Sequence, residues 1–397
     1  MQVSHAGGQA LPQPDADSQA HSERVAGFLK QQLEMAGGSL SFADFMHHAL
    51  YAPGLGYYVA GARKFGVDGD FVTAPEIAPV FSRVLGRQLA GVLQQFADDE
   101  QNILEIGAGS GALAVDVLGA LSELECLPAT YQILEVSPEL ALRQREAISD
   151  ALPQIIDRVC WVDRFPTEFC GVVIANEVLD ALPVERFRKQ DGQVLRDCVT
   201  ASKAGFEWQS GPAPDNLRAA VAALEADVGP FADGYVSEVC IAAEAWISEL
   251  AASLKRAAVF LFDYGVSQRE YYAPDRHEGW LRCYFRHRMH NDPLILTGIQ
   301  DLTSWVNFTQ IAGCAVTAGL QVDSYASQAH FLLSGGLQEE ILLINEMPTA
   351  AQIELSRQVK VLTMPGEMGE NIKLLALSTG DIEVPDVLLA TDRAHTL

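Results

Sequence analysis

The chain has 397 residues, of which 49% are hydrophobic and 20% are charged, so it can bury a substantial core and is not globally disordered. Its net charge of −25 argues against binding to a phosphate backbone, which requires basic patches, and excludes nucleic acid as the default partner. The charge favours a small ligand or a basic partner protein.

Neither the hydropathy nor the cysteine pattern indicates a membrane or secreted protein. No apolar run approaches the roughly 18 residues of a membrane-spanning helix. The N-terminus lacks the charged-then-apolar order of a secretory signal. The seven cysteines form no CxxC pair and no zinc spacing, and His287 and His290 are too loosely placed to predict a metal site. We therefore expect a cytoplasmic protein with reduced thiols, no membrane span and no metal.

The N-terminal part divides into a tail and a helical segment. Residues 1–20 are small, polar and proline-containing, and are predicted to form a disordered tail. Residues 21–97 are predicted to contain three helices: one ending at Gly37 and Gly38, one capped by Ser41, and one over 77–96. Residues 51–76, rich in glycine and aromatic residues without a clean period, predict an ordered loop that carries function.

From residue 98 to 397, short apolar strands alternate with helices. Strands are predicted at 102–107, 131–136, 157–162, 171–176, 257–265 and 371–377, with helices at 112–121 and 138–148. This alternation predicts the α/β class, with a doubly wound, mostly parallel sheet. Insertions are expected at about 190–250, around a helical run, and at 266–310, an aromatic segment predicted to be a lid over the carboxyl edge of the sheet.

A glycine loop follows the first of these strands. Gly107, Gly109 and Gly111 stand between strand and helix, where bare backbone lets a nucleotide-like ligand approach. The loop also satisfies G-x-G-x-x-G/A, so a dinucleotide site competes, and a plain turn without a ligand is the least favoured interpretation. Glu105 favours the cationic ammonium and sulfonium end of S-adenosylmethionine over a pyrophosphate. Glu135, at the end of the second strand, could accept both ribose hydroxyls of either ligand.

A polar cluster ends the fourth strand. Asn176, Glu177 and Asp180 should lie at the carboxyl edge of the sheet, beside the glycine loop. Two acids within one turn can hold a guanidinium or an amine in line with a sulfonium methyl group. Helix capping is the plainer alternative, since acids favour helix N-termini. Asp263 and Tyr264 close the fifth strand in the same layer and are further candidates.

Several blocks occur in one order along the chain: YAPGLGYY (51–58), GDFVTAPEIAPVF (69–81), EIGAGSG (105–111) and NEVLDALPVERF (176–187), followed by blocks at 263–265, 279–294, 298–308 and 365–377. Together they resemble the MidA-like family of class I S-adenosylmethionine-dependent methyltransferases, the family of the mitochondrial complex I assembly arginine methyltransferase. The resemblance covers about residues 38–380. It implies a Rossmann-like methyltransferase core that methylates a protein arginine.

The resemblance also implies roles for individual residues. It places Gly107, Gly109, Gly111 and Glu135 at the cofactor, Thr73, Pro75 and Glu76 in the lining of the pocket, and Asn176, Glu177 and Asp180 facing the transferable methyl group. With the reasoning from the residues added, we predict Glu105, Asn176, Thr73 and Pro75 as further cofactor-binding residues, and Glu177, Asp180 and Glu76 as catalytic residues. The implied partner is a client protein presenting an arginine, with a respiratory-complex subunit as one candidate. The chain departs from the family pattern at four positions, and these departures bear on the identity of the substrate more than on cofactor binding: Trp280, Glu185, Trp305 and Asn307. The alternatives are an assembly factor that binds S-adenosylmethionine without transferring methyl, and an NAD(P)-dependent oxidoreductase.

Overall fold

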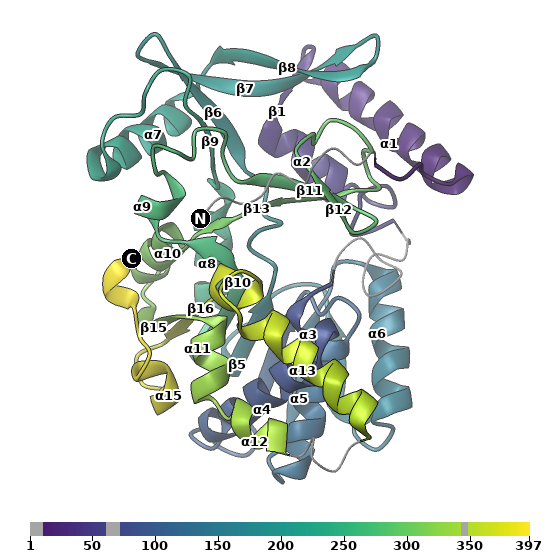
Figure 1. Ribbon diagram of the computed structural model, residues 1–397, viewed down its shortest axis with the longest axis vertical. Coiled ribbons are helices and arrows are strands. Elements are labelled where there is room, and N and C mark those ends of the chain that lie inside the picture. Colours follow the sequence, from purple (N-terminus) through teal and green to yellow (C-terminus); the bar gives the residue numbers. More distant parts are fainter. Residues whose placement is uncertain (1–10, 61–71, 343–347) are drawn as a thin grey trace.

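A twisted, mostly parallel sheet forms the centre of the larger lobe (Figure 1). The computed structural model describes residues 11–60, 72–342 and 348–397. Along the sheet the strand order is β15-β16-β10-β5-β2-β3-β4, and β14 pairs with β10. The bounds are β2 (Asn102–Ile106), β3 (Thr130–Leu134), β4 (Val159–Val162), β5 (Phe169–Asn176), β10 (Leu254–Val266), β14 (Val306–Asn307), β15 (Gln321–Ser327) and β16 (Ile372–Ser378). On this path only β16 runs against the other strands: it pairs antiparallel with both β15 and β10, and the remaining pairs are parallel.

Helices cover both faces of this sheet, which explains why its central strands are buried almost throughout. One core contains apolar side chains of α4, α5 and α11, and the core on the opposite face contains those of α8 and α10. The helices of this lobe are α3 (Ala74–Ile77), α4 (Pro79–Leu93), α5 (Ala112–Glu123), α6 (Pro138–Ala151), α8 (Ala242–Ser253), α10 (Phe308–Thr317), α11 (Gln328–Ser334), α12 (Leu337–Leu342), α13 (Thr349–Thr363), α14 (Met368–Asn371) and α15 (Asp386–Leu389). The predicted doubly wound α/β fold is confirmed.

The topology creates one natural binding edge. Strand β2 has β3 on one side and β5 on the other, and all three are parallel. Their carboxyl ends therefore meet at a switch point, where the chain leaves the sheet in opposite directions and a crevice opens. The glycine loop after β2 lies at this point.

A second lobe is built on an antiparallel sheet in the order β1-β7-β6-β9, with β8 paired to β7. Its elements are α1 (Ala16–Met35), β1 (Ser39–Ser41), α2 (Phe42–Tyr51), β6 (Glu185–Gln190), β7 (Gln193–Ser202), β8 (Gly205–Pro212), α7 (Asp215–Val228) and β9 (Val236–Val239). The insertion at about 190–250 thus contains α7, its predicted helical run, together with strands that the sequence pattern did not reveal. Strand β1 brings the N-terminal segment into this sheet.

The aromatic insertion forms a small sheet in the order β12-β11-β13, which lies between the two lobes (Figure 1). Its elements are α9 (Gln268–Tyr271), β11 (Leu281–Phe285), β12 (Arg288–His290) and β13 (Asp301–Ser304). The backbone N–H of Ser304 donates to the carbonyl of Asp180, with 2.9 Å between nitrogen and oxygen. This insertion therefore contacts the carboxyl edge, where a lid was expected.

Two helical predictions need correction. Helix α1 begins at Ala16, inside the predicted tail, because Asp15 caps it by accepting from the backbone N–H of Ser18 at 2.8 Å. Residues 1–10 of that tail and residues 61–71 of the predicted loop lie outside the described residues. The helix predicted over 77–96 is α4, which spans only Pro79–Leu93: Ile77 ends α3, Ala78 is extended and Pro79 opens α4. None of the described helices is long and apolar enough to cross a membrane.

Candidate active site

The glycine loop joins β2 to α5 at the switch point. Gly107, Gly109 and Gly111 have φ angles of 67°, 54° and 88°, in the left-handed region that other residues rarely adopt. A Cβ atom on Gly111 would lie 3.3 Å from the Cα of Gln144. Gly107 and Gly109 line a cavity, whereas Gly111 forms the left-handed cap at the start of α5. Gly107 and Gly109 thus face the cavity, whereas Gly111 packs against α6.

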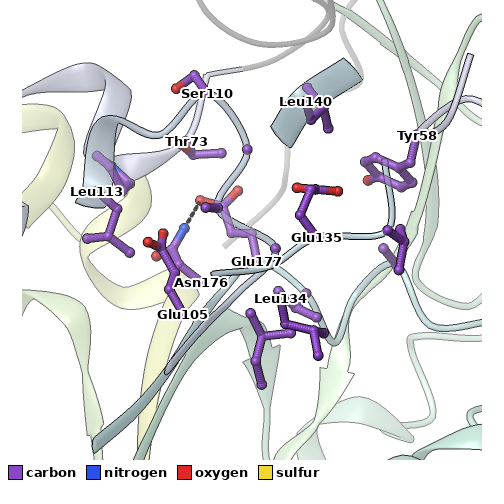
Figure 2. A pocket seen from close by; sticks show the side chains of 18 of the residues that line it. Tyr58, Thr73, Glu105, Ser110, Leu113, Leu134, Glu135, Leu140, Asn176 and Glu177 are labelled. Atoms are coloured by element: carbon purple, nitrogen blue, oxygen red, sulfur yellow. Dashed lines mark hydrogen bonds between the residues drawn. The ribbon is translucent and has the colours of Figure 1, made fainter. Parts of the chain in front are cut away.

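Glu135 follows β3 directly, and its carboxyl group points into this first cavity (Figure 2). Its Oε1 accepts from the N–H of Ser137 at 2.9 Å, and its Oε2 accepts from Nε2 of Gln144 at 2.8 Å. Gln144, fully buried on α6, also donates to the carbonyl of Gly109 at 3.0 Å and accepts from Nε1 of Trp161 at 2.9 Å. Gln144 therefore fixes the acid relative to the glycine loop.

The first cavity has a volume of about 260 Å³. Leu113, Leu134 and Leu140 give it apolar walls (Figure 2). Thr73, Pro75 and Glu76 also line it, and Oε2 of Glu76 accepts from the N–H of Thr73 at 3.3 Å, which caps the start of α3. The apolar walls suit an adenine ring, and a carboxylate at one end suits a ribose diol. The residues present therefore fit an adenosyl ligand.

Glu105 lies on β2 and is almost fully buried, although it too lines the cavity. The Tyr131 hydroxyl donates to its Oε2 at 2.7 Å. Burial raises the pKa of Glu105 to about 7, the Tyr131 hydrogen bond opposes this, and the charge of Glu135 adds to it. One oxygen of the acid expected to face a cationic ligand is thus already bonded to a tyrosine.

Glu177 stands in a strained turn at the end of β5. Its φ of 54° is unusual for a residue with a side chain, and such conformations concentrate at functional sites. Its N–H donates to the carbonyl of Phe262 at 2.8 Å. Its Oε1 accepts from Nδ2 of Asn176 at 3.1 Å (Figure 2) and from the N–H of Ala74 at 3.4 Å. The Oδ1 of Asn176 is buried without a hydrogen-bond partner among the described residues, so it offers a ligand an acceptor.

Asp263, the further candidate on β10, holds this turn in place. Its Oδ2 accepts from the backbone N–H groups of Val178, Leu179 and Asp180, at 3.1, 2.8 and 3.2 Å. Its Oδ1 accepts from the N–H of Tyr264 at 2.8 Å. Because both oxygens are bonded to backbone, Asp263 supports Glu177 and Asp180 and does not line either cavity of the site.

The acids of the turn are poised to receive a cation. Loss of solvent, with a smaller contribution from the charge of Asp180, raises the pKa of the Glu177 carboxyl to about 8. Burial, followed by the charges of Asp263 and Asp301, raises the pKa of Asp180 well above its usual range. Within the described part of the chain, neither Glu177 nor Asp180 forms an ion pair with a lysine or arginine. A guanidinium arriving here would relieve this repulsion.

A second cavity of about 280 Å³ adjoins the first. The two cavities share Tyr58 and Glu177. The second is lined by Tyr58, Val72, Glu177, Asp180, Tyr264, Tyr284, His287, Met289, Asp301, Thr303 and Trp305. It therefore combines acidic and aromatic groups, a composition that suits a cationic acceptor, and Glu177 lies where the two cavities meet.

Sequence reasoning missed three residues of this site: Gln144, Tyr58 and Asp301. The Tyr58 hydroxyl donates to Oδ1 of Asp301 at 2.8 Å, across 243 positions of sequence. The aromatic and glycine-rich texture around Tyr58 was a signal, whereas nothing local distinguishes Asp301 from other acids. His287 lines the second cavity, but the described residues hold no group of three histidine, cysteine or acidic side chains that could bind a metal.

Comparisons with known proteins agree with this geometry. The model of a family described as S-adenosyl-L-methionine-dependent methyltransferases matches residues 84–326. The protein arginine methyltransferase NDUFAF7 homolog, mitochondrial, of Drosophila melanogaster is 28% identical over 93% of this chain and 88% of its own length. The protein arginine methyltransferase NDUFAF7, mitochondrial, of Danio rerio is 26% identical over 86% of this chain and 84% of its own.

Solved structures give a closer match. A crystal structure from Burkholderia thailandensis, bound to S-adenosyl-homocysteine, superposes with a TM-score of 0.92 at 39% identity, covering 98% of this chain and all of the other. A native structure from the same organism superposes with a TM-score of 0.89 at 38% identity and the same coverage. These matches cover both lobes of the fold.

One expectation is contradicted. The curated relatives from fly, zebrafish and rat are mitochondrial proteins by name, which conflicts with the prediction of a cytoplasmic protein. That prediction rested on reduced cysteines and on a missing secretory signal, and neither feature distinguishes the cytoplasm from other compartments that keep thiols reduced.

Proposed function

The chain belongs to the family of S-adenosyl-L-methionine-dependent methyltransferases, and we propose that its methyl acceptor is an arginine side chain of a client protein. The cofactor supplies an electrophilic methyl group on a sulfonium. We assign the ribose hydroxyls to Glu135, the close backbone approach to Gly107 and Gly109, and the adenine to the apolar walls. Thr73, Pro75, Glu76, Glu105 and Asn176 complete the cofactor side.

The second cavity is the proposed acceptor site. An arginine remains charged at any ordinary pH, so its nitrogens are poor nucleophiles until the site orients them. Glu177 and Asp180 would pair with the guanidinium and make the attacking nitrogen more electron-rich. Glu76 lies on the cofactor side, where its cap fixes the start of α3. The names of the fly and zebrafish relatives support arginine as the acceptor class.

One observation carries the proposal: Glu177 lines both cavities. A group at this junction contacts the acceptor nitrogen at the place where that nitrogen must meet the transferable methyl. As the nitrogen bonds to the methyl carbon, the bond between that carbon and the sulfonium sulfur would break and S-adenosylhomocysteine would leave. The nitrogen would lose a proton, which the Glu177 carboxylate, with its raised pKa, is suited to accept. Positioning of this kind accounts for several kcal/mol of barrier reduction in well-oriented reactions.

The function is tested by methylarginine formation. We expect the purified protein, with labelled S-adenosylmethionine, to methylate arginine in proteins extracted from a strain that lacks its gene. Acid hydrolysis and chromatography would identify the modified residue. Heat-inactivated enzyme is the control. Cofactor binding without any methylated product would instead favour the assembly-factor alternative, and methylation confined to other residue types would refute arginine as the acceptor.

Replacing Glu135 is expected to damage cofactor binding selectively. Glu135→Ala removes a charge-assisted acceptor pair and should weaken S-adenosylmethionine and S-adenosylhomocysteine binding by roughly 10- to 100-fold, whereas Glu135→Gln should lose less. Calorimetry measures both, with NAD as a ligand expected to give no heat. Wild-type affinity in Glu135→Ala would remove this residue from the cofactor site.

A further inference from the structure

We propose that Asp301, positioned by Tyr58, is a recognition residue that binds the guanidinium of the acceptor arginine in the second cavity. The proposal rests on the proposed function, because it takes an arginine as the acceptor. It adds to the acids of the turn after β5 a carboxylate from β13, which belongs to a different part of the chain. The acceptor site would therefore be completed by the small sheet between the lobes.

The position of Asp301 is tightly fixed. It is only 1% exposed and lines the second cavity. The ring of Tyr58, which donates its hydroxyl proton to Asp301, stacks on Tyr51 with centroids 5.5 Å apart and an interplanar angle of 24°. The Tyr51 hydroxyl donates in turn to the carbonyl of Ala181 at 3.0 Å. Two tyrosines thus connect Asp301 to the segment that follows Asp180.

Asp301 and Asp180 also face the cavity from two connected elements. The N–H of Ser304 on β13 donates to the carbonyl of Asp180. In the backbone pairing of β13 with β11, Asp301 lies opposite Tyr284. A guanidinium presents five N–H donors in a planar fork, so carboxylates on two sides can bind it at once. An ammonium is a compact point charge and gains less from this arrangement.

An aromatic wall favours the same planar cation. Trp305 lines the cavity and stacks on Trp280, with centroids 4.4 Å apart and an interplanar angle of 19°. Nε1 of Trp280 donates to the carbonyl of Tyr271 at 2.8 Å, which fixes the pair. A guanidinium can stack on such a face while its edge bonds to carboxylates.

The location of Asp301 separates recognition of the acceptor from binding of the cofactor. Asp301 lines the second cavity and not the first, whereas Tyr58 lines both. Loss of the Asp301 charge should therefore weaken acceptor binding with little effect on S-adenosylmethionine. Loss of the Tyr58 hydroxyl should act in the same direction but less strongly, because the carboxylate remains.

The experiment measures the initial rate of methylarginine formation against the concentration of proteins extracted from a strain that lacks the gene, at saturating S-adenosylmethionine. For Asp301→Asn we expect the half-saturating protein concentration to rise at least about tenfold, with cofactor affinity within about twofold of wild type. Tyr58→Phe should raise the half-saturating protein concentration about threefold, and Asp301→Glu should raise it less than Asp301→Asn does. Asp99→Asn, an exposed change of the same charge, should match wild type.

Each outcome decides something. Unchanged half-saturation in Asp301→Asn, or an equal loss of cofactor affinity, would overturn the recognition role. If the Asp301→Asn protein is misfolded and fails to bind cofactor, the Tyr58→Phe variant provides the test, because it keeps the ring that stacks on Tyr51. An unchanged half-saturating protein concentration in Tyr58→Phe would then overturn the proposal. Absence of methylarginine with wild-type enzyme would refute the proposed function itself, whereas transfer with unaltered variants would refute only Asp301.

Discussion

Replacing Glu177 with glutamine is expected to lower methyl-transfer turnover by about a thousandfold while leaving cofactor affinity within a few-fold. The amide has the size and shape of the acid, and its oxygen can still accept from Nδ2 of Asn176 and from the N–H of Ala74. It cannot attract a guanidinium or take up its proton. The substitution therefore removes charge and basicity and preserves the geometry of the turn.

Single-turnover rates with saturating S-adenosylmethionine measure this effect, and calorimetry measures cofactor affinity on the same samples. Glu249→Gln, an exposed change of the same kind on α8, is the matched control and should behave as wild type. Turnover within tenfold of wild type in Glu177→Gln would move the proton-accepting role to another group, and parallel loss of cofactor binding would make Glu177 a cofactor residue.

The cofactor half of the site could be predicted from the sequence because its signals are local. The glycine loop and Glu135 each occupy the few residues after a recognisable apolar strand, and parallel strands bring such ends to one edge. Glu177 follows β5 in the same way. For these residues, knowing that the chain forms a parallel sheet was enough to place them together.

The second lobe could not be predicted in this way. Strand β6 carries charged residues that are depleted in strands generally, yet its Glu185, Phe187 and Lys189 are buried in alternation. Their charges are satisfied by partners elsewhere: Glu185 pairs with Arg196, and Lys189 contacts Glu225 at 2.6 Å. From the sequence alone, β6 looks like an exposed polar segment. The residues that neutralise its buried charges lie elsewhere in the chain and cannot be recognised as partners before the fold is known.

The acceptor half of the site depends on contacts between distant segments. Tyr58, Asp180 and Asp301 come from the N-terminal segment, the main sheet and the small sheet, and only the packing of both lobes brings them to one cavity. No spacing rule relates them. A functional assignment from local motifs therefore finds the cofactor more readily than the substrate.

The raised pKa values of Glu105 and Glu177 should make the stability of the folded protein depend on pH. A carboxyl whose folded pKa is raised binds its proton more tightly in the folded than in the unfolded state. Stability is then fully present below the ordinary pKa of 4.5 and is lost as pH rises through the folded pKa, which is about 8 for Glu177 and about 7 for Glu105. The wild-type protein should therefore be less stable at pH 9 than at pH 5.

Glu177→Gln is expected to recover part of this loss. At pH 9 it should be more stable than wild type by on the order of 3 kcal/mol, or roughly 4 °C in melting temperature, because it cannot ionise in the low-dielectric turn. At pH 5, where wild-type Glu177 is protonated, the two proteins should melt together. Thermal unfolding across pH 5–9 measures the difference, with Glu249→Gln expected to follow wild type throughout. A constant offset between Glu177→Gln and wild type at every pH would mean that packing, not ionisation, sets the effect. A difference confined to high pH would show that the partly buried charge of Glu177, which is proposed to bind the acceptor, destabilises the protein when no acceptor is bound.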